Sequence, residues 1–152
     1  MIEPALGVDR AVLTILVDGY EEEQLAKEKR VVLRIRPDLA PVKAAVLPLL
    51  RNRPELVERG RRLTSDLKQQ LAAQYDDTAS IGKLYRRQDE IGTPYCVTID
   101  PESLDDGAAT IRERDSMTQE RVSLELIPQR VADLVAGRAT WEGVPRQAAR
   151  DA

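Results

Sequence analysis

The chain has 152 residues, of which 42% are hydrophobic, and its formal net charge is −3. This length suits one domain with a real core, and no apolar run is long enough to cross a membrane, so we expect no membrane partner. Cys96 is the only cysteine, which excludes an intrachain disulfide and favours a reduced, cytoplasmic setting. The absence of histidine excludes a Ser-His-Asp triad and the usual zinc ligation. The acidic balance argues against clamping a long duplex, although a local patch can still bind a few nucleotides.

The N-terminal part of the chain predicts a helix, a charged connector and a strand. Asp9 is the expected N-cap, and the apolar residues that follow repeat on one helical face: Val12, Leu13, Leu16, Val17 and Tyr20. The charged stretch of residues 21–30 is expected to be a solvated helix end or a connector. Residues 30–36 then alternate as a strand.

The next segment alternates between strand and helix patterns. Residues 42–50 are almost continuously apolar, which is typical of a strand covered on both faces. Pro54 suits a first helical turn, and an amphipathic helix of about five turns follows, with Leu56, Gly60, Leu63, Leu67 and Leu71 on one face. A short extended piece is expected around residues 74–76. Strand and helix in alternation predict an α/β fold.

Residues 80–100 predict a short helix that leads directly into a buried strand. Gly92 supplies a left-handed stop, and residues 95–100 alternate as a strand. One side of the helix is charged and carries Lys83, Arg86, Arg87 and Glu90. Charge pattern alone favours a solvated helix side with an Arg86–Glu90 pair. Cys96, in the strand, is expected to be a small buried apolar group.

The remaining residues predict a hairpin, one more strand and a last helix. Residues 108–114 are expected to pair with the strand at 95–100, and residues 120–124 form the last strand. Gly137 closes the last helix, and Trp141 is expected to hold the start of the tail on the body. Arg112 and Arg114 share one strand face, for which two interpretations remain open: pairing with Asp115, or an edge of a binding site. The Asp76-Asp77 pair is expected to be a loop or cap feature rather than a metal site.

Residues 75–100 carry a family resemblance. The run Y-D-D-T-A-S-I-G-K-L-Y-R-R-Q-D-E-I-G-T-P-Y-C-V-T-I-D resembles the C-terminal anticodon-binding domain of the bacterial-type dimeric glycyl-tRNA synthetases. Family-like stretches also occur at 39–49, at 110–117 and, as a C-terminal extension seen in some members, at 139–141. The resemblance covers nearly the whole chain.

The resemblance implies a fold, a ligand and a set of contacts. The fold is a mixed sheet of about five strands flanked by helices, over residues 30–137, with a tail at 138–152. The ligand is the anticodon of tRNA-Gly, whose splayed bases are read by their edges and by stacking on rings or guanidinium planes. The residues expected to contact RNA are Lys83, Tyr85, Arg86, Arg87, Asp89, Glu90, Arg112 and Arg114. For Tyr85, packing in the core stays open as an equal alternative to stacking on a base. For Asp89 and Glu90, the expected role is to accept a hydrogen bond from a base amino group.

Residues 1–29 resemble the end of the catalytic domain, with its third signature motif at residues 2–10. In the family, the arginine at Arg10 contacts ATP and the acidic residue at Glu3 helps to hold the glycine ammonium. The rest of the catalytic sheet is not in this sequence, so we expect no catalytic residues and no cofactor in this chain. The resemblance assigns ATP and magnesium to the parent enzyme, and it implies the catalytic domain of a glycyl-tRNA synthetase as a partner, with a homodimer as a compatible assembly.

Three positions depart from the family pattern. Ala5 stands where serine is usual, Ala79 where glycine is usual, and Leu84 where a basic residue is usual. Ala79 is expected to strain the loop before the helix, and Leu84 to remove a charge from the RNA edge. Two alternatives to a tRNA-binding module stay open: a non-catalytic accessory subunit with the same fold, and a C-terminal fragment of a full glycyl-tRNA synthetase.

Overall fold

A five-stranded sheet forms the centre of the fold in the computed structural model, which describes residues 5, 7–25 and 29–144. Its strands lie in the order β4-β3-β5-β6-β7. The strands β4, β3 and β5 are parallel, whereas β6 and β7 join as antiparallel neighbours. The strands span Ala44–Pro48 (β3), Ala73–Tyr75 (β4), Tyr95–Ile99 (β5), Ala108–Glu113 (β6) and Gln119–Ser123 (β7). The predicted α/β class and mixed sheet are confirmed.

The two central strands, β3 and β5, are buried along their whole length. Parallel strands that are covered on both faces are near-continuous apolar runs, and this is why the sequence pattern located them. Their side chains alternate between two hydrophobic clusters. In β3, Ala44 and Val46 belong to the larger cluster, and Ala45 and Leu47 belong to the smaller one.

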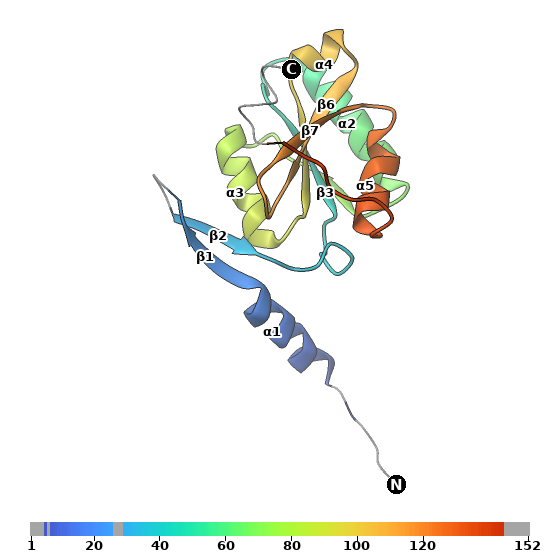
Figure 1. Ribbon diagram of the computed structural model, residues 1–152. Helices are drawn as coiled ribbons and strands as arrows, with labels where there is room; N and C mark the ends of the chain where they lie inside the picture. The colour runs from blue at the N-terminus through green and yellow to red at the C-terminus, as the bar shows by residue number, and fades with distance from the viewer. Residues whose placement is uncertain (1–4, 6, 26–28, 145–152) are drawn as a thin grey trace.

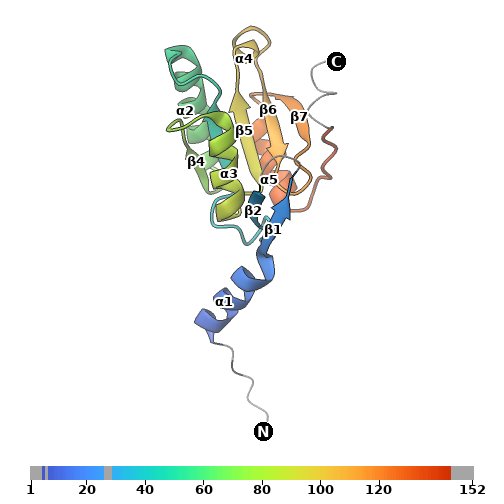
Figure 2. The ribbon, with the colours of Figure 1, turned by 90° about the vertical axis from the view of Figure 1, so that its left-hand side faces the viewer.

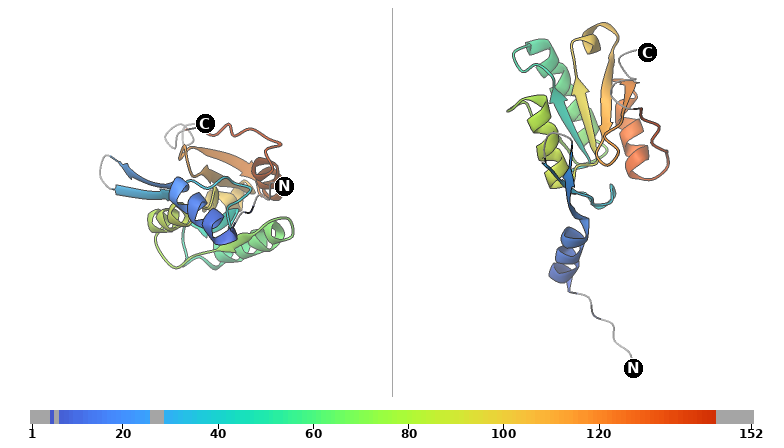
Figure 3. Two further views of the ribbon diagram at one scale, coloured as in Figure 1. Left: turned by 90° about the horizontal axis from the view of Figure 1, so that it is seen from below. Right: turned by 60° about the vertical axis from the view of Figure 1, so that its left-hand side comes forward.

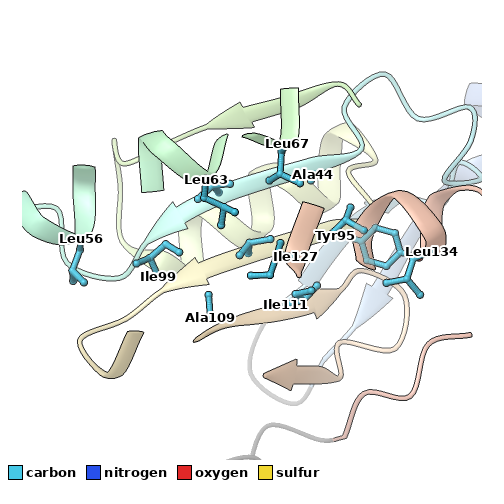
Figure 4. Close-up of a cluster of buried hydrophobic side chains, with 13 residues drawn as sticks. Ala44, Leu56, Leu63, Leu67, Tyr95, Ile99, Ala109, Ile111, Ile127 and Leu134 are labelled. Carbon is cyan, nitrogen blue, oxygen red and sulfur yellow. The ribbon is translucent and has the colours of Figure 1, made fainter. Parts of the chain in front are cut away.

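Helices cover the two faces of this sheet unequally. The helices α2 (Pro54–Lys68) and α5 (Ile127–Val135) pack on the face of the larger cluster (Figure 4). On the other face, α3 (Ile81–Ile91) packs through Leu84 on the smaller cluster. The short α4 (Glu102–Asp105) connects β5 to β6. Among the described residues, no helix lies over β6 and β7 on the α3 side (Figure 2).

The C-terminal end of α3 follows the sequence signal at Gly92. Ser80 is the N-cap residue with an extended backbone, and Gly92 ends the helix in the left-handed conformation with φ 82°. Glycine is needed at this end for a second reason, because a Cβ on Gly92 would come within 3.0 Å of the Leu33 carbonyl oxygen. The chain therefore turns sharply from α3 into β5 while it contacts the N-terminal part of the protein.

Most described residues of the charged stretch at 21–30 belong to the two antiparallel strands of a hairpin, which corrects the expectation of a connector. The hairpin consists of β1 (Tyr20–Gln24) and β2 (Lys29–Leu33). Its two strands carry opposite charges: Lys29 pairs with Glu22, and Arg30 Nη1 lies 2.7 Å from Glu23 Oε2. Because Glu and Lys have low strand propensity, alternation and composition did not reveal the pairing.

The first helix, α1 (Val8–Gly19), projects from the body of the molecule (Figures 1 and 3). Gly7 occupies its N-cap position and Asp9 lies in the first turn, so the predicted cap was wrong by two residues. Its apolar residues are exposed, with Val8 at 75% and Val17 at 69%. Within the described part of the chain, no helix is long and apolar enough to cross a membrane.

Candidate nucleic-acid interface

A groove of about 680 Å³ lies where α3 meets the β6–β7 hairpin. It is lined from α3 by Gly82, Lys83, Tyr85, Arg86, Arg87 and Glu90, and from the hairpin by Arg112, Met117 and Gln119. Four of these side chains are cationic and one is a carboxylate, so the groove is a basic site on a chain of net charge −3. Its lining residues come from α3 and from the β6–β7 hairpin, whose strands no described helix covers on the α3 side.

The floor of the groove is formed by Tyr85 and Arg112. The guanidinium carbon of Arg112 lies 4.8 Å from the centre of the Tyr85 ring, which is a cation–π distance. The Tyr85 hydroxyl and Thr98 Oγ1 are 2.6 Å apart, so the ring is anchored at its far end on β5. Tyr85 is half-buried, whereas Arg112 is only 5% exposed. The phenol ring is thus the surface on which an unstacked base can settle, and the Arg112 guanidinium supports it.

Asp89 lies beneath this floor, where it holds arginines from three elements. Arg30 Nε donates to Asp89 Oδ2 at 2.8 Å, and Arg112 Nη1 donates to Oδ1 at 3.0 Å. Arg86 Nη1 is 3.6 Å from Asp89 Oδ2. The Asp89 side chain has no exposed surface and both its oxygens are occupied. The expectation that Asp89 accepts from a base amino group is therefore corrected: Asp89 positions groove residues from below.

The buried cluster around Asp89 favours the charged state of Arg30. Burial alone would lower the pKa of Arg30, but hydrogen bonds to Asp89 and Glu23 outweigh it and raise that pKa. Arg30 Nη2 also donates to the Arg114 carbonyl at 2.5 Å. The cluster thus joins the β1–β2 hairpin, α3 and β6 directly under the groove.

Arg114 lies outside the groove and is 2% exposed, which corrects its assignment to the RNA edge. Its Nη1 donates to the carbonyls of Leu33, Ile35 and Gly92 at 2.9–3.0 Å. Its Nε donates to Asp115 Oδ1 at 2.7 Å. Of the two interpretations that the sequence left open for Arg114, the structural pairing with Asp115 is the one observed.

Lys83, Arg87 and Glu90 are exposed and form the rim of the groove. Arg87 Nη1 pairs with Asp76 and donates to Thr78 Oγ1 at 2.9 Å, which ties the rim to the loop before α3. Burial tends to raise the pKa of Asp76, but hydrogen bonds from Thr78 and the Arg87 cation outweigh burial, and the pKa is lowered. The predicted loop role of Asp76 is confirmed. Within the described residues, no group of acidic, cysteine or histidine side chains could hold a metal ion.

Residues 43–134 match the family described as Anticodon binding domain. This stretch runs from the residue before β3 into α5 and contains every residue of the groove. The chain belongs to this family.

Several glycine–tRNA ligases are similar in sequence to most of this chain. The chain is 52% identical over 142 residues to the glycine–tRNA ligase of Thermobifida fusca, which covers 90% of this chain and 30% of that protein. Against the glycine–tRNA ligase of Streptomyces coelicolor, the identity is 52%, over 90% of this chain and 31% of that protein. For the Clostridium acetobutylicum glycine–tRNA ligase, it is 52% over 82% of this chain and 27% of that protein. The chain therefore spans about 30% of the length of the glycine–tRNA ligases that it matches.

Three groove residues of this anticodon-binding domain were missed at the level of sequence: Gly82, Met117 and Gln119. Met117 and Gln119 reach the groove because β7 pairs with β6, which sets Gln119 directly opposite Arg112. A last strand at residues 120–124 was predicted, but its pairing with residues 108–114 was not, and the facing residues depend on the register of that pairing. Alternation of side chains along residues 108–114, continued through the turn into the last strand, was the sequence signal that could have identified Met117 and Gln119.

The departures from the family pattern have small structural effects in this anticodon-binding domain. Met117 is the only non-glycine residue with positive φ in the described part of the chain, so the backbone at Ala79 does not require glycine. Leu84 is completely buried against Ala45 and Leu47, and it takes no charge away from the groove surface. Both expectations, of strain at Ala79 and of a lost surface charge at Leu84, were wrong.

Of the two residues assigned by resemblance to an ATP and glycine site, only Arg10 lies within the described residues. Glu3 lies outside the described residues, and Arg10 lies on α1, which projects away from the sheet (Figure 1). Cys96 is buried, and desolvation raises the pKa of its thiol to about 12. A thiol with that pKa is protonated at neutral pH, which agrees with the predicted role as a small apolar group.

Proposed function

We propose that this chain binds the anticodon loop of tRNA-Gly in the groove between α3 and the β6–β7 hairpin. The observation that carries the proposal is the stacked floor of Tyr85 and Arg112 beneath a rim of cations, inside the residues that match the Anticodon binding domain. The choice of tRNA-Gly rests on the relatives, which are glycine–tRNA ligases.

The floor suits splayed bases better than a continuous duplex. Sequence-specific RNA recognition targets loops whose bases can stack on aromatic or guanidinium planes, because those bases expose their edges. Here the two planes are held rigidly: Thr98 anchors the Tyr85 hydroxyl, and Asp89 holds the Arg112 guanidinium. A base entering the groove therefore meets a surface that needs little ordering.

The rim supplies the phosphate contacts. Lys83 is exposed and makes no ion pair with any described residue, so its ammonium is available to a phosphate. Arg87 makes both its contacts through Nη1, which leaves its other donors for RNA. Phosphate contacts position the RNA in the groove, whereas base contacts specify its sequence.

The proposal assigns only the recognition step to this chain. ATP, magnesium and the attachment of glycine belong to the catalytic portion of a glycine–tRNA ligase, which we include as the proposed partner. A homodimer and a cytoplasmic location form part of the same proposal, and both come from the family resemblance.

The first test is discrimination between anticodons. The chain is titrated at one fixed salt concentration with a tRNA-Gly transcript and with transcripts in which each anticodon base is replaced in turn. We expect the unaltered transcript to bind most tightly, by about 1–3 kcal/mol for each base that is read. Equal affinity for all transcripts would contradict the proposal and favour an accessory role that does not involve the anticodon.

The second test locates the phosphate contact. Lys83→Ala should weaken the binding of every transcript by a similar factor and make the salt dependence shallower by about one counterion. Lys68→Ala is the matched control, because Lys68 is an exposed lysine on α2, which packs on the opposite face of the sheet. An effect of Lys68→Ala as large as that of Lys83→Ala would show that RNA binds elsewhere.

A further inference from the structure

Gln119 is a polar residue of the groove whose side chain makes no hydrogen bond within the described fold. Its side chain lines the groove and the residue is only 9% exposed. Within the part of the chain that the structure describes, its amide makes no hydrogen bond. Neither polar atom of the amide belongs to the buried side-chain atoms without a partner, so the amide is accessible from the groove. The amide is therefore poised for a ligand that enters the groove.

The backbone of Gln119 is fixed from both sides. Its N–H donates to the Val144 carbonyl at 2.8 Å, and the Val144 N–H donates back to the Gln119 carbonyl at 2.8 Å. On its other side it pairs with Arg112 across the β6–β7 ladder. The preceding residue, Thr118, accepts a hydrogen bond from Trp141 Nε1 at 2.7 Å. The amide is thus presented from a rigid position, which lowers the entropic cost of binding.

The Gln119 amide can make a contact that the charged groups of the groove cannot make. The arginines and the lysine can only donate hydrogen bonds, and the carboxylate of Glu90 can only accept them. The Tyr85 hydroxyl is already engaged with Thr98. Gln119 offers a donor and an acceptor side by side, and this matches the adjacent donor and acceptor on the edge of an unstacked base.

We infer that Gln119 reads the edge of one anticodon base, an inference that rests on the function proposed above. Gln119 stands opposite Arg112, whose guanidinium lies against Tyr85. Directly opposed residues in an antiparallel pair have Cβ atoms about 4.5–5.5 Å apart. A base stacked on the Tyr85–Arg112 floor therefore has the Gln119 amide beside its edge.

The experiment removes the amide and follows each anticodon position. Gln119→Ala should weaken binding of the unaltered tRNA-Gly transcript by roughly 5- to 100-fold. One of the three substituted transcripts should bind the variant and the parent chain almost equally, because the contact it lost is already absent. Discrimination at the other two positions should persist. Gln119→Met keeps the length of the side chain without its polar atoms, and it should give the same pattern.

Two controls separate recognition from folding. Gln129→Ala removes an exposed glutamine on α5, whose partner is Asp133 within the same helix, and it should leave all affinities unchanged. Trp141 is the only tryptophan and contacts Thr118 and Tyr95, so its fluorescence reports whether the hairpin stays folded in each variant.

The outcomes distinguish this inference from the proposed function. If the parent chain discriminates among the transcripts and both Gln119 variants keep that discrimination at all three positions, Gln119 is not the reader. Loss of discrimination in Gln129→Ala to the same extent would also overturn the assignment. If the parent chain itself binds all transcripts equally, the proposed function fails, and this assignment fails with it.

Discussion

Asp89 sits among three arginines, and its burial makes those contacts far more consequential than surface ion pairs. Surface pairs contribute about 0–1 kcal/mol because water and salt screen them. Arg30, in contrast, has no exposed surface, so its charge depends on Asp89 and on Glu23 at the edge of the cluster. The same carboxylate fixes Arg112 in the floor of the groove. One buried residue therefore serves both the stability of the chain and the geometry of the groove.

Asp89→Asn is expected to destabilise the chain by about 3–5 kcal/mol, because it leaves the buried Arg30 and Arg112 without a full counter-charge. Urea unfolding followed by circular dichroism measures the loss. Asp66→Asn, at an exposed position on α2, is the matched control and should change stability by no more than about 0.5 kcal/mol. A variant as stable as the parent chain would show that the cluster is dispensable.

At the scale of elements, a set of ion pairs links the β1–β2 hairpin to the sheet domain. Arg34 pairs with Glu21 and Glu23 on β1, and its Nη1 lies 2.9 Å from Asp115 Oδ1 in the turn after β6. Arg30 extends from β2 to Asp89 on α3. Val32 on β2 is also completely buried, so apolar packing contributes to the same attachment. The attachment of the hairpin therefore depends on ionisation as well as on packing.

Acid is expected to loosen this hairpin. Burial tends to raise the pKa of Glu23, but hydrogen bonds and charge interactions with Arg30 and Arg34 outweigh burial and lower that pKa below 4.5. Burial likewise tends to raise the pKa of Asp115, but Arg114 and Arg34 lower it below 3.8. Groups with a depressed folded-state pKa stabilise the fold above their unfolded pKa, and that contribution is lost as the pH falls through the folded value. Stability should therefore hold at pH 5–7 and decline below about pH 4.5.

Amide hydrogen exchange at a series of pH values, corrected for the intrinsic exchange rate, measures this loss at β1 and β2. In Glu23→Gln the hairpin should already be less protected at pH 7, and its protection should change less with pH than in the parent chain. Equal pH dependence in the two proteins would assign the effect to other carboxylates, Asp115 first among them.

At the scale of the whole molecule, the fold consists of a packed sheet domain and a helix that stands away from it (Figure 1). The apolar residues of α1 remain exposed, so they contribute nothing to the core. Leu84, in contrast, is buried between α3 and β3. The apolar residues of this chain therefore divide into those that hold the domain together and those that a partner would have to cover.

Val17→Gln is expected to change the unfolding free energy of the sheet domain by no more than about 0.5 kcal/mol, since Val17 is 69% exposed. Leu84→Ala should cost about 2–5 kcal/mol, because it opens a cavity in the smaller cluster. Thermal unfolding followed by circular dichroism compares the two. A large effect of Val17→Gln would mean that α1 folds back onto the domain in solution.

The sequence predicted those parts of the molecule that depend on local patterns. Buried strands such as residues 95–99 and the end of α3 at Gly92 follow from runs of apolar residues and from backbone freedom, which are properties of neighbouring residues. The β1 strand escaped prediction because its stability comes from charges on β2. Asp89 and Arg114 were assigned to the surface because the helical and strand faces were inferred without knowing which neighbours bury them. Gln119 was missed because register across the hairpin is a long-range property.

Met117 carries a further consequence. Its φ of 56° places a branch-free but full-sized side chain in the left-handed region, which costs about 1 kcal/mol relative to glycine. Random variants of this chain that are selected for heat resistance alone should therefore accumulate glycine at position 117. Variants selected for capture of tRNA-Gly should keep an apolar side chain there, since Met117 lines the groove. The two selections would therefore give different residues at position 117. That result would show that Met117 is retained for its contact with the groove and not for its contribution to stability.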